Sequence, residues 1–328
     1  MTRVIAANGW VMGLVALLVI LLIATKIIQP DFGISGLDSL GRAALPFALA
    51  TLGMSVVVIA GGIDLSLASV MAVCSVTAAL LMDGASDGSA NGQAVLIVLA
   101  VLVLGAAMGA VNGALIVVSR VPDIVVTLAM LFVWQGVALL ILNAPGGGAA
   151  PWLRALIVGG LTLPGIPPAL TEWLPKSLVF LLVCLAVIWL PIRRSKLGLQ
   201  FYAVGSDSLA AFRSGVPVGR TRIAAYAVAG LFAALGGISV TMSTGIGEPI
   251  PGPYLLASVA AAVLGGVTLG GGKGGLIGPI LAVFVLRLVR MDLTLLAVDP
   301  NVTAIVEGSI MVAVVMFGGV LATRGRTT

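Results

Sequence analysis

Near its start the chain reads Trp10-Val-Met-Gly-Leu-Val-Ala-Leu-Leu-Val-Ile-Leu-Leu-Ile-Ala-Thr-Lys-Ile-Ile28, an apolar stretch that decides the fold class. A helix that crosses a bilayer needs about 20 predominantly apolar residues. This stretch is longer than the roughly 7–15 apolar residues of a secretory signal, and no small-x-small cleavage site follows before Lys26. We therefore predict an uncleaved membrane span.

Comparable apolar runs recur along the whole chain. Of its 328 residues, 60% are hydrophobic and 9% are charged, whereas soluble domains carry roughly 25% charged residues. We predict an all-α polytopic membrane protein with about ten transmembrane helices, forming a single domain over residues 1–328. The predicted spans are 10–28, 43–60, 65–82, 93–118, 123–142, 175–192, 223–244, 255–271, 275–291 and 302–322.

The composition excludes several classes of function. Histidine is absent, which removes imidazole bases and His-ligated metals. Cys74 and Cys184 lie in apolar runs without a CxxC pair and are expected to be buried small hydrophobic residues. The glycine-rich segment 270–275 lacks the P-loop spacing, because Lys273 is followed by Gly274. We predict no catalytic residue, metal ligand or cofactor in this chain, and interpret 270–275 as a tight reversal between spans.

Glycine is unusually frequent, with 43 residues, roughly twice the usual share of ~7%. No collagen-like period accompanies it. In a membrane protein such an excess favours close helix packing and broken helices.

The positive charges predict the orientation. Six of them lie within residues 193–222, which carry one acid, Asp207; they are Arg193, Arg194, Lys196, Arg213, Arg220 and Arg222. Because cytoplasmic loops are enriched in Lys and Arg, we place 193–222 in the cytoplasm, and ten spans then put both termini there. A nucleic-acid partner is not indicated, because no basic stripe is interleaved with aromatic residues. An inverted five-plus-five repeat fits this parity, although the two halves show no convincing sequence match.

The polar segment 193–222 has the features of a docking element. Ser206 or Asp207 can cap a short helix, and Gly215 is suited to the position just past its end. A short helix with small and aromatic residues suits a groove on a partner, although an ordinary charged loop is the alternative. The exposed surface of the predicted helix would be formed by Leu209, Ala210, Phe212 and Arg213.

Four ordered segments carry a resemblance. They are Gly61-Gly-Ile-Asp-Leu-Ser66; Asn112-Gly-Ala-Leu-Ile116 with Pro122 and Ile124-Val-Val-Thr-Leu128; Gly205-Ser-Asp-Ser-Leu-Ala-Ala-Phe-Arg-Ser-Gly-Val216 with Tyr226 and Gly230; and Ala260-Ala-Ala-Val-Leu-Gly-Gly-Val-Thr-Leu-Gly-Gly-Gly-Lys-Gly274. In this order they resemble the permeases of sugar-type ABC importers, the ribose/xylose/galactoside branch related to branched-chain amino acid permeases. Three positions depart from that pattern. Leu255 follows Tyr254 where Glu is usual, Glu307 stands where many relatives carry Lys, and Asp207 replaces Asn.

The resemblance implies a transport subunit of the bacterial inner membrane and not an enzyme. Its solute would be small and polar, a monosaccharide by preference, delivered by a periplasmic binding protein. Two cytoplasmic ATPase domains, which bind ATP and Mg, would dock on 193–222, and a second permease copy or a paralogue would complete the pathway. The residues implied in ATPase coupling are Asp207, Ala210, Ala211, Arg213 and Gly215. The alternative is a secondary transporter, which would need charged or cation-coordinating residues in the span centres, where they are sparse.

Other polar residues are candidates for lining or shaping the translocation pathway: Asp64, Ser66, Asn112, Thr127, Trp134 and Gln135. Each has a structural alternative, since Asp64 can cap the next helix, Asn112 can join two helices and Trp134 can simply pack.

Charged residues in or near the spans complete the set of candidates. Glu248 would face the binding protein or line the entrance, unless it is a solvated loop residue. Glu307 could pair with Arg287 or Arg290, since charges within spans are usually paired.

Overall fold

The computed structural model describes residues 2–83, 91–162, 164–250, 252 and 254–324, and this part contains helices and no strand. Its elements are α1 (Thr2–Ile28), α2 (Ile34–Ile59), α3 (Leu67–Met82), α4 (Asn91–Ser119), α5 (Asp123–Ile141), α6 (Pro151–Ala155), α7 (Pro168–Thr171), α8 (Lys176–Cys184), the π-helical turn η2 (Leu185–Trp189), α9 (Leu190–Arg194), α10 (Lys196–Ser206), α11 (Ser208–Arg213), α12 (Val218–Thr244), α13 (Tyr254–Leu264), α14 (Ile277–Leu295) and α15 (Pro300–Arg324).

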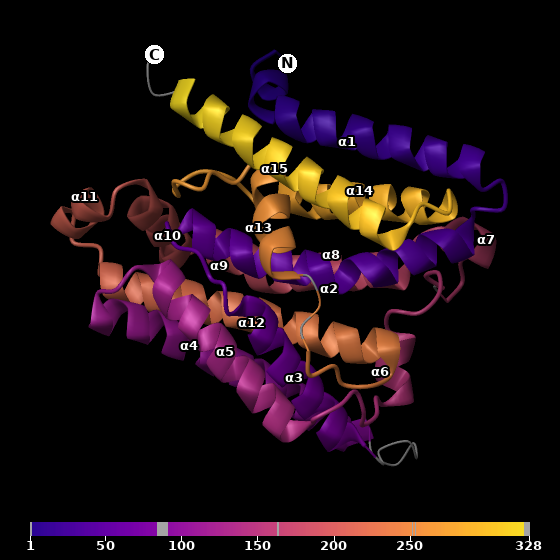
Figure 1. Cartoon of the computed structure of the whole chain (residues 1–328), viewed down its shortest axis with the longest axis horizontal. Coiled ribbons are helices and arrows are strands. Elements are labelled where there is room, and N and C mark those ends of the chain that lie inside the picture. Colours follow the sequence, from indigo (N-terminus) through magenta and orange to yellow (C-terminus); the bar gives the residue numbers. More distant parts are fainter. Residues whose placement is uncertain (1, 84–90, 163, 251, 253, 325–328) are drawn as a thin grey trace.

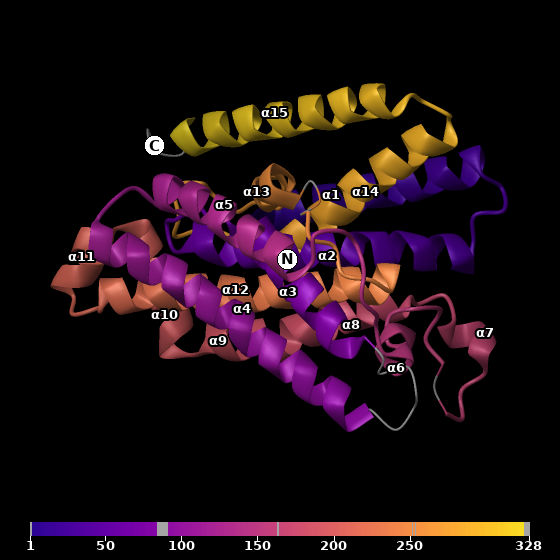
Figure 2. The same ribbon diagram turned by 60° about the horizontal axis from the view of Figure 1, so that its bottom comes forward.

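The long helices run back and forth between two ends of the molecule (Figure 1). The short helices α10 and α11 lie at one end, together with the last described turn of α15, and α6 and α7 lie at the other. Turning the molecule shows α15 lying along its outside, next to α13 and α14 (Figure 2). The segment 193–222 and the connections around α6 and α7 therefore occupy opposite ends.

Within the described residues, six helices are long and apolar enough to cross a membrane: α1, α2, α4, α5, the continuous α8–η2–α9 segment and α12. Large apolar side chains such as Ile20, Val103 and Phe132 are exposed on the outer helices. A protein with this surface requires lipid around it, because contiguous exposed apolar area is unfavourable in water. The chain is a multi-pass membrane protein.

Two further apolar helices are short. The helix α3 has 16 residues, and α13 has 11. The predicted span 255–271 was therefore too long, because the helix ends at Leu264 and the glycine-rich segment that follows leaves helical geometry, with positive φ at Gly266 and Gly271. Glycine reaches this left-handed region at little cost.

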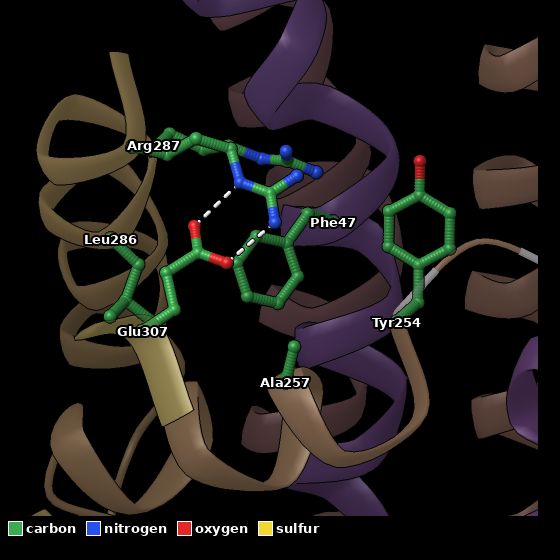
Figure 3. A pocket seen from close by; sticks show the side chains of 7 residues that line it. Phe47, Tyr254, Ala257, Leu286, Arg287 and Glu307 are labelled. Atoms are coloured by element: carbon green, nitrogen blue, oxygen red, sulfur yellow. Dashed lines mark hydrogen bonds and ion pairs between the residues drawn. The ribbon is translucent and has the colours of Figure 1, made fainter. Parts of the chain in front are cut away.

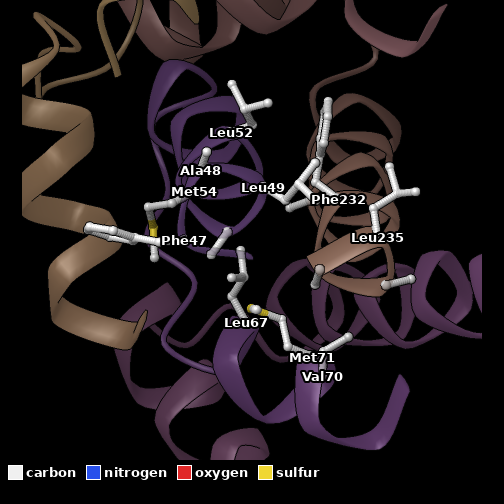
Figure 4. Close-up of a cluster of buried hydrophobic side chains, with 14 of the residues drawn as sticks. Phe47, Ala48, Leu49, Leu52, Met54, Leu67, Val70, Met71, Phe232 and Leu235 are labelled. Atoms are coloured by element: carbon white, nitrogen blue, oxygen red, sulfur yellow. The ribbon is translucent and has the colours of Figure 1, made fainter. Parts of the chain in front are cut away.

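The core lies where α2, α3 and α12 meet (Figure 4). Leu49 of α2, Leu67 of α3 and Phe232 of α12 are among the largest fully buried or nearly buried side chains. The apolar sequence of α2 is buried almost throughout its length, whereas α1 and α5 are mostly exposed. The three central helices therefore form a scaffold, and the outer helices cover it.

Glycine brings α4 and α12 into backbone contact. A Cβ atom at Gly109 would collide with the carbonyl oxygen of Tyr226, and one at Gly105 would lie 2.6 Å from the carbonyl oxygen of Gly230. Small residues at such crossings let membrane helices approach closely. The glycine excess is thus explained in part by this one interface.

Candidate coupling and transport sites

A chain of hydrogen bonds links the α2–α3 connection to α4 and α5. The Asp64 Oδ1 atom accepts from the backbone N–H of Ser66 at 2.9 Å and from its hydroxyl at 2.5 Å. Asn112 of α4 donates from Nδ2 to Ser66 Oγ at 2.6 Å, and Trp134 of α5 donates from Nε1 to Asn112 Oδ1 at 3.1 Å. We call these four residues the Ser66 network. The donors and acceptors of these four residues form hydrogen bonds with one another.

A second set of polar contacts lies beside this network. Thr127 donates to the backbone oxygen of Asp123 at 2.8 Å, and Tyr226 of α12 donates to Asp123 Oδ2 at 3.0 Å. Arg222 lies 3.7 Å from Asp123 Oδ1. Asp123 therefore ties the start of α5 to the start of α12. Sequence inspection missed it, although an acid directly after Pro122, at the start of an apolar run, is a signal for a helix N-terminus.

The predicted roles of these residues have separate outcomes. Asn112 forms the predicted interhelical hydrogen bonds. The prediction that Asp64 caps the next helix was wrong, because Ser66 occupies the N-cap of α3 and Asp64 binds Ser66 instead. Gln135 takes part in none of the hydrogen bonds of the Ser66 network. A role of these residues in the pathway stays a prediction.

Most of the segment 193–222 is helical, because besides the predicted short helix it contains the end of α9, all of α10 and the start of α12. The helix α10 begins after Ser195, whose hydroxyl oxygen accepts from the N–H of Leu197. Its apolar residues Leu197, Phe201 and Val204 recur at helical spacing, and Phe201 and Val204 are buried. That spacing was the signal which could have predicted α10.

The short helix α11 follows as predicted. Asp207 Oδ1 accepts from the N–H groups of Leu209 and Ala210 at 2.9 Å each, and Gly215 has a φ of +83°. Ala211 is buried and is therefore not part of a docking surface. The side chains exposed on α11 include Leu209, Ala210, Phe212 and Arg213.

Three backbone segments meet closely at the C-terminal end of α10, where only the short Ser206 side chain lies beside Gly272. The N–H of Gly272 donates to the carbonyl oxygen of Ile59 at 2.9 Å. A Cβ atom at Gly205 would collide with that same oxygen, and one at Gly271 would lie 2.9 Å from the Cα atom of Gly61. We call this contact of Gly61, Gly205, Gly271 and Gly272 the glycine junction. It joins the end of α10 to the end of α2 and to the α13–α14 connection.

The α13–α14 connection makes a sharp reversal, as predicted. Gly271, Gly272 and Gly274 all have positive φ values, and Lys273 is exposed. The Tyr202 hydroxyl of α10 donates to the Gly274 carbonyl oxygen at 2.9 Å. Burial raises the pKa of the Tyr202 hydroxyl above its usual range, so it remains a donor at neutral pH. This bond adds a second link between α10 and the reversal.

Charged side chains pair between α14 and α15 (Figure 3). Arg290 donates from Nε and from a terminal nitrogen to the two carboxylate oxygens of Glu307, at 2.6 and 2.5 Å. Arg287 lies with its guanidinium carbon 5.1 Å from the centre of the Phe47 ring, a cation–π contact. Of the two predicted partners, Glu307 thus pairs with Arg290.

Glu248 lies in the connection between α12 and α13, far along the chain from the Ser66 network. Its backbone N–H donates to Ser75 Oγ of α3 at 3.1 Å. Its side chain lines a cavity of about 220 Å³ between α3 and α12. Within the described residues, no group of three or more His, Cys, Asp or Glu side chains could hold a metal ion.

Comparison with known proteins identifies the family. Residues 36–315 match the family described as "Branched-chain amino acid transport system / permease component". The chain is 29% identical over 324 residues to the Autoinducer 2 import system permease protein LsrD of Escherichia coli O9:H4 (strain HS), Escherichia coli (strain K12) and Shigella flexneri; the alignments cover 94% of this chain and 91% of each relative. No solved structure matches. The chain therefore belongs to the permease-component family of branched-chain amino acid transport systems and is a permease subunit of an ABC importer.

Proposed function

We propose that this permease subunit moves a monosaccharide-like solute across the bacterial inner membrane through ten spans, with 193–222 and both termini in the cytoplasm. The relatives named as Autoinducer 2 import permeases support a small-molecule import role, and the four sequence segments quoted above support a sugar-type solute. Membership of the family disfavours the secondary transporter. The orientation can be tested at position 208. The cysteine of a Ser208→Cys variant should not be labelled by membrane-impermeant thiol reagents in intact cells, and labelling would contradict the proposal.

The partners follow from the importer class. Two cytoplasmic ATPase domains, which bind ATP and Mg, would dock at the end that carries α10 and α11. A periplasmic binding protein would dock at the opposite end, near α6 and α7 (Figure 1). A second permease copy or a paralogue would enclose the pathway. The chain would itself remain a transport subunit, with hydrolysis on the ATPases.

The observation that carries the coupling role is the glycine junction. An ATPase that displaced α11 would move α10, because the two helices are joined through the single residue Asp207. The end of α10 touches the backbone of α2 and of the α13–α14 connection. Since this contact is made mainly by backbone atoms, with only the short Ser206 side chain beside Gly272, a displacement of α10 would pass directly to the end of α2 and to the α13–α14 connection.

The apolar surface of α11 provides the test. Phe212 is 67% exposed and Leu209 is 56% exposed, so a charge there should not disturb the fold. We expect Phe212→Glu to abolish co-purification of the ATPase subunit and ATP-driven uptake, while the permease inserts at normal levels. The matched control for ATPase binding is Ile166→Glu, an exposed apolar residue in the connection between α6 and α7, which should still co-purify with the ATPase. Retained ATPase binding in Phe212→Glu would contradict the coupling role of α11.

A further inference from the structure

The polar region beside Glu248 differs from the Ser66 network because it borders an open cavity. The cavity has a volume of about 220 Å³, and its walls come from α3, α12, the residues Glu248, Ile250 and Gly252, and Tyr254 at the start of α13. Small side chains, Ala68 and Ala72 of α3, leave the space open. Sites for drug-sized ligands measure roughly 300–1,000 Å³. This cavity therefore suits a smaller molecule.

The polar groups of the cavity are not all in use. Ser75 Oγ already lies 3.0 Å from Thr241 Oγ1 and accepts from the Glu248 N–H. Thr244 donates to the backbone oxygen of Ile246 at 2.8 Å. The Glu248 carboxylate forms no hydrogen bond or ion pair with any described residue. Glu248 is half-buried, and an ionised carboxylate accepts several hydrogen bonds, so hydroxyl groups of a ligand could take the place of water at this residue.

The place of the cavity in the fold also points to a ligand. Counted along the ten predicted spans, the short helix α3 is the third, and the short helix α13 is the third of the second half. In transporters with repeated halves, short or broken helices at corresponding positions mark the solute site. The cavity touches both of these helices, α3 from Ala68 to Ser75 and α13 at its first residue.

A second cavity nearby is a poorer candidate. Tyr254 lines both cavities, and on its other side lies a space of about 40 Å³ beside Arg287, Arg290 and Glu307 (Figure 3). A single water has a share of liquid volume of about 30 Å³. The smaller space therefore has room for little more than water, and Tyr254 forms the wall between the two.

We propose that the cavity beside Glu248 holds the solute within the permease, and that the solute is an uncharged polyhydroxylated molecule of monosaccharide size. This inference rests on the function proposed above. The free carboxylate would accept hydrogen bonds from two adjacent hydroxyl groups, which is the strongest uncharged-ligand pattern that Glu248 can form. Apolar walls from Met71, Val240 and Ile250 would contact the C–H faces of a sugar ring. An anionic solute would be repelled by Glu248.

The test measures solute moved per ATP hydrolysed, in proteoliposomes that contain the permease with its ATPase and binding protein. The probes are D-ribose and autoinducer 2. A hydrogen bond to a charged group corresponds to roughly a 10- to 100-fold effect, so Glu248→Gln should lower uptake at least 10-fold while ATP hydrolysis continues. The matched control is Glu172→Gln, a carboxylate in the connection between α7 and α8, outside the cavity. It should match the wild type.

A second variant tests the cavity independently, in case Glu248→Gln misfolds. Ala72→Leu should fill the cavity and lower uptake at least 10-fold, whereas Ala100→Leu, on the exposed side of α4, should not. Unchanged solute per ATP in both cavity variants would overturn the inference and leave the proposed function standing. A wild-type system that moves neither probe with ATP would instead refute the proposed function, and the inference with it.

Discussion

The Ser66 network and the Glu248 cavity both place carboxylate and hydroxyl groups among apolar helices, yet they use them differently. In the network, donors and acceptors meet at 2.5 to 3.1 Å and leave no space between them. At the cavity, Glu248 is one of the residues that line about 220 Å³, and its carboxylate has no hydrogen-bond partner among the described residues. Buried polar groups that satisfy one another fix a structure. A half-buried carboxylate without a protein partner is open to water or to a ligand, and the proposal above assigns it a ligand.

On the proposal above, the two regions would have different roles, one shaping the pathway and the other contacting the solute. We interpret the Ser66 network as a set of hydrogen bonds that holds the start of α3 against α4 and α5. The helix α3 also forms one wall of the cavity through Ala68, Met71, Ala72 and Ser75. The network would then set the position of this wall without contacting the solute.

The largest effect is expected from a substitution that disrupts the packing of α4 against α12. A Cβ atom at Gly109 would collide with the Tyr226 backbone, and backbone cannot rotate away as a side chain can. Overpacking of a well-packed core typically costs about 1–3 kcal/mol and occasionally more, so Gly109→Val should lie at the upper end and reduce folded protein in detergent. Size-exclusion chromatography measures it. Gly136→Val in α5, where no atom lies within 4 Å, is the matched control and should elute as wild type does.

The next effect concerns the network alone. Asn112→Ala removes the donor to Ser66 Oγ, which keeps its bond to Asp64, and leaves Trp134 Nε1 without its acceptor. A buried polar group left without a partner costs about 1–3 kcal/mol. We expect a lower thermal midpoint in detergent, with unchanged solute moved per ATP. Normal stability combined with lost uptake would instead place Asn112 in contact with the solute.

The smallest effect sharpens the assignment within the network. Trp134→Phe removes one hydrogen bond, the 3.1 Å contact to Asn112, and a net intramolecular hydrogen bond is worth about 0.5–1.5 kcal/mol. The loss in unfolding free energy should be of that size. In the Asn112→Ala background, Trp134→Phe should cause almost no further loss in unfolding free energy, because the bond between the two side chains is already broken. Fully additive losses would show that the two side chains do not interact.

Much of the architecture followed from local patterns in the sequence. Apolar runs predicted a polytopic all-α protein, and Asp207 and Gly215 predicted the ends of α11, because capping depends on residues only a few positions apart. The interhelical role of Asn112 followed from an amide inside an apolar run. These inferences needed only the neighbours in the chain.

The remainder depended on contacts between distant segments. The early end of α13 was missed because apolar residues continue beyond Leu264 into the glycine-rich reversal. The choice of Arg290 over Arg287 as partner of Glu307 depends on how α14 is rotated against α15. The cavity was beyond sequence inspection, because Glu248 meets α3 across more than 170 residues of sequence. Hydropathy does not specify such a juxtaposition.

One measurement tests the central distinction most directly: solute moved per ATP hydrolysed, determined side by side with thermal stability for Glu248→Gln and Asn112→Ala. We predict that Glu248→Gln keeps wild-type stability and loses at least 10-fold in solute moved per ATP. We predict that Asn112→Ala loses stability and keeps the wild-type ratio. The opposite pattern, with transport lost in Asn112→Ala and retained in Glu248→Gln, would contradict the account and place the solute at the Ser66 network.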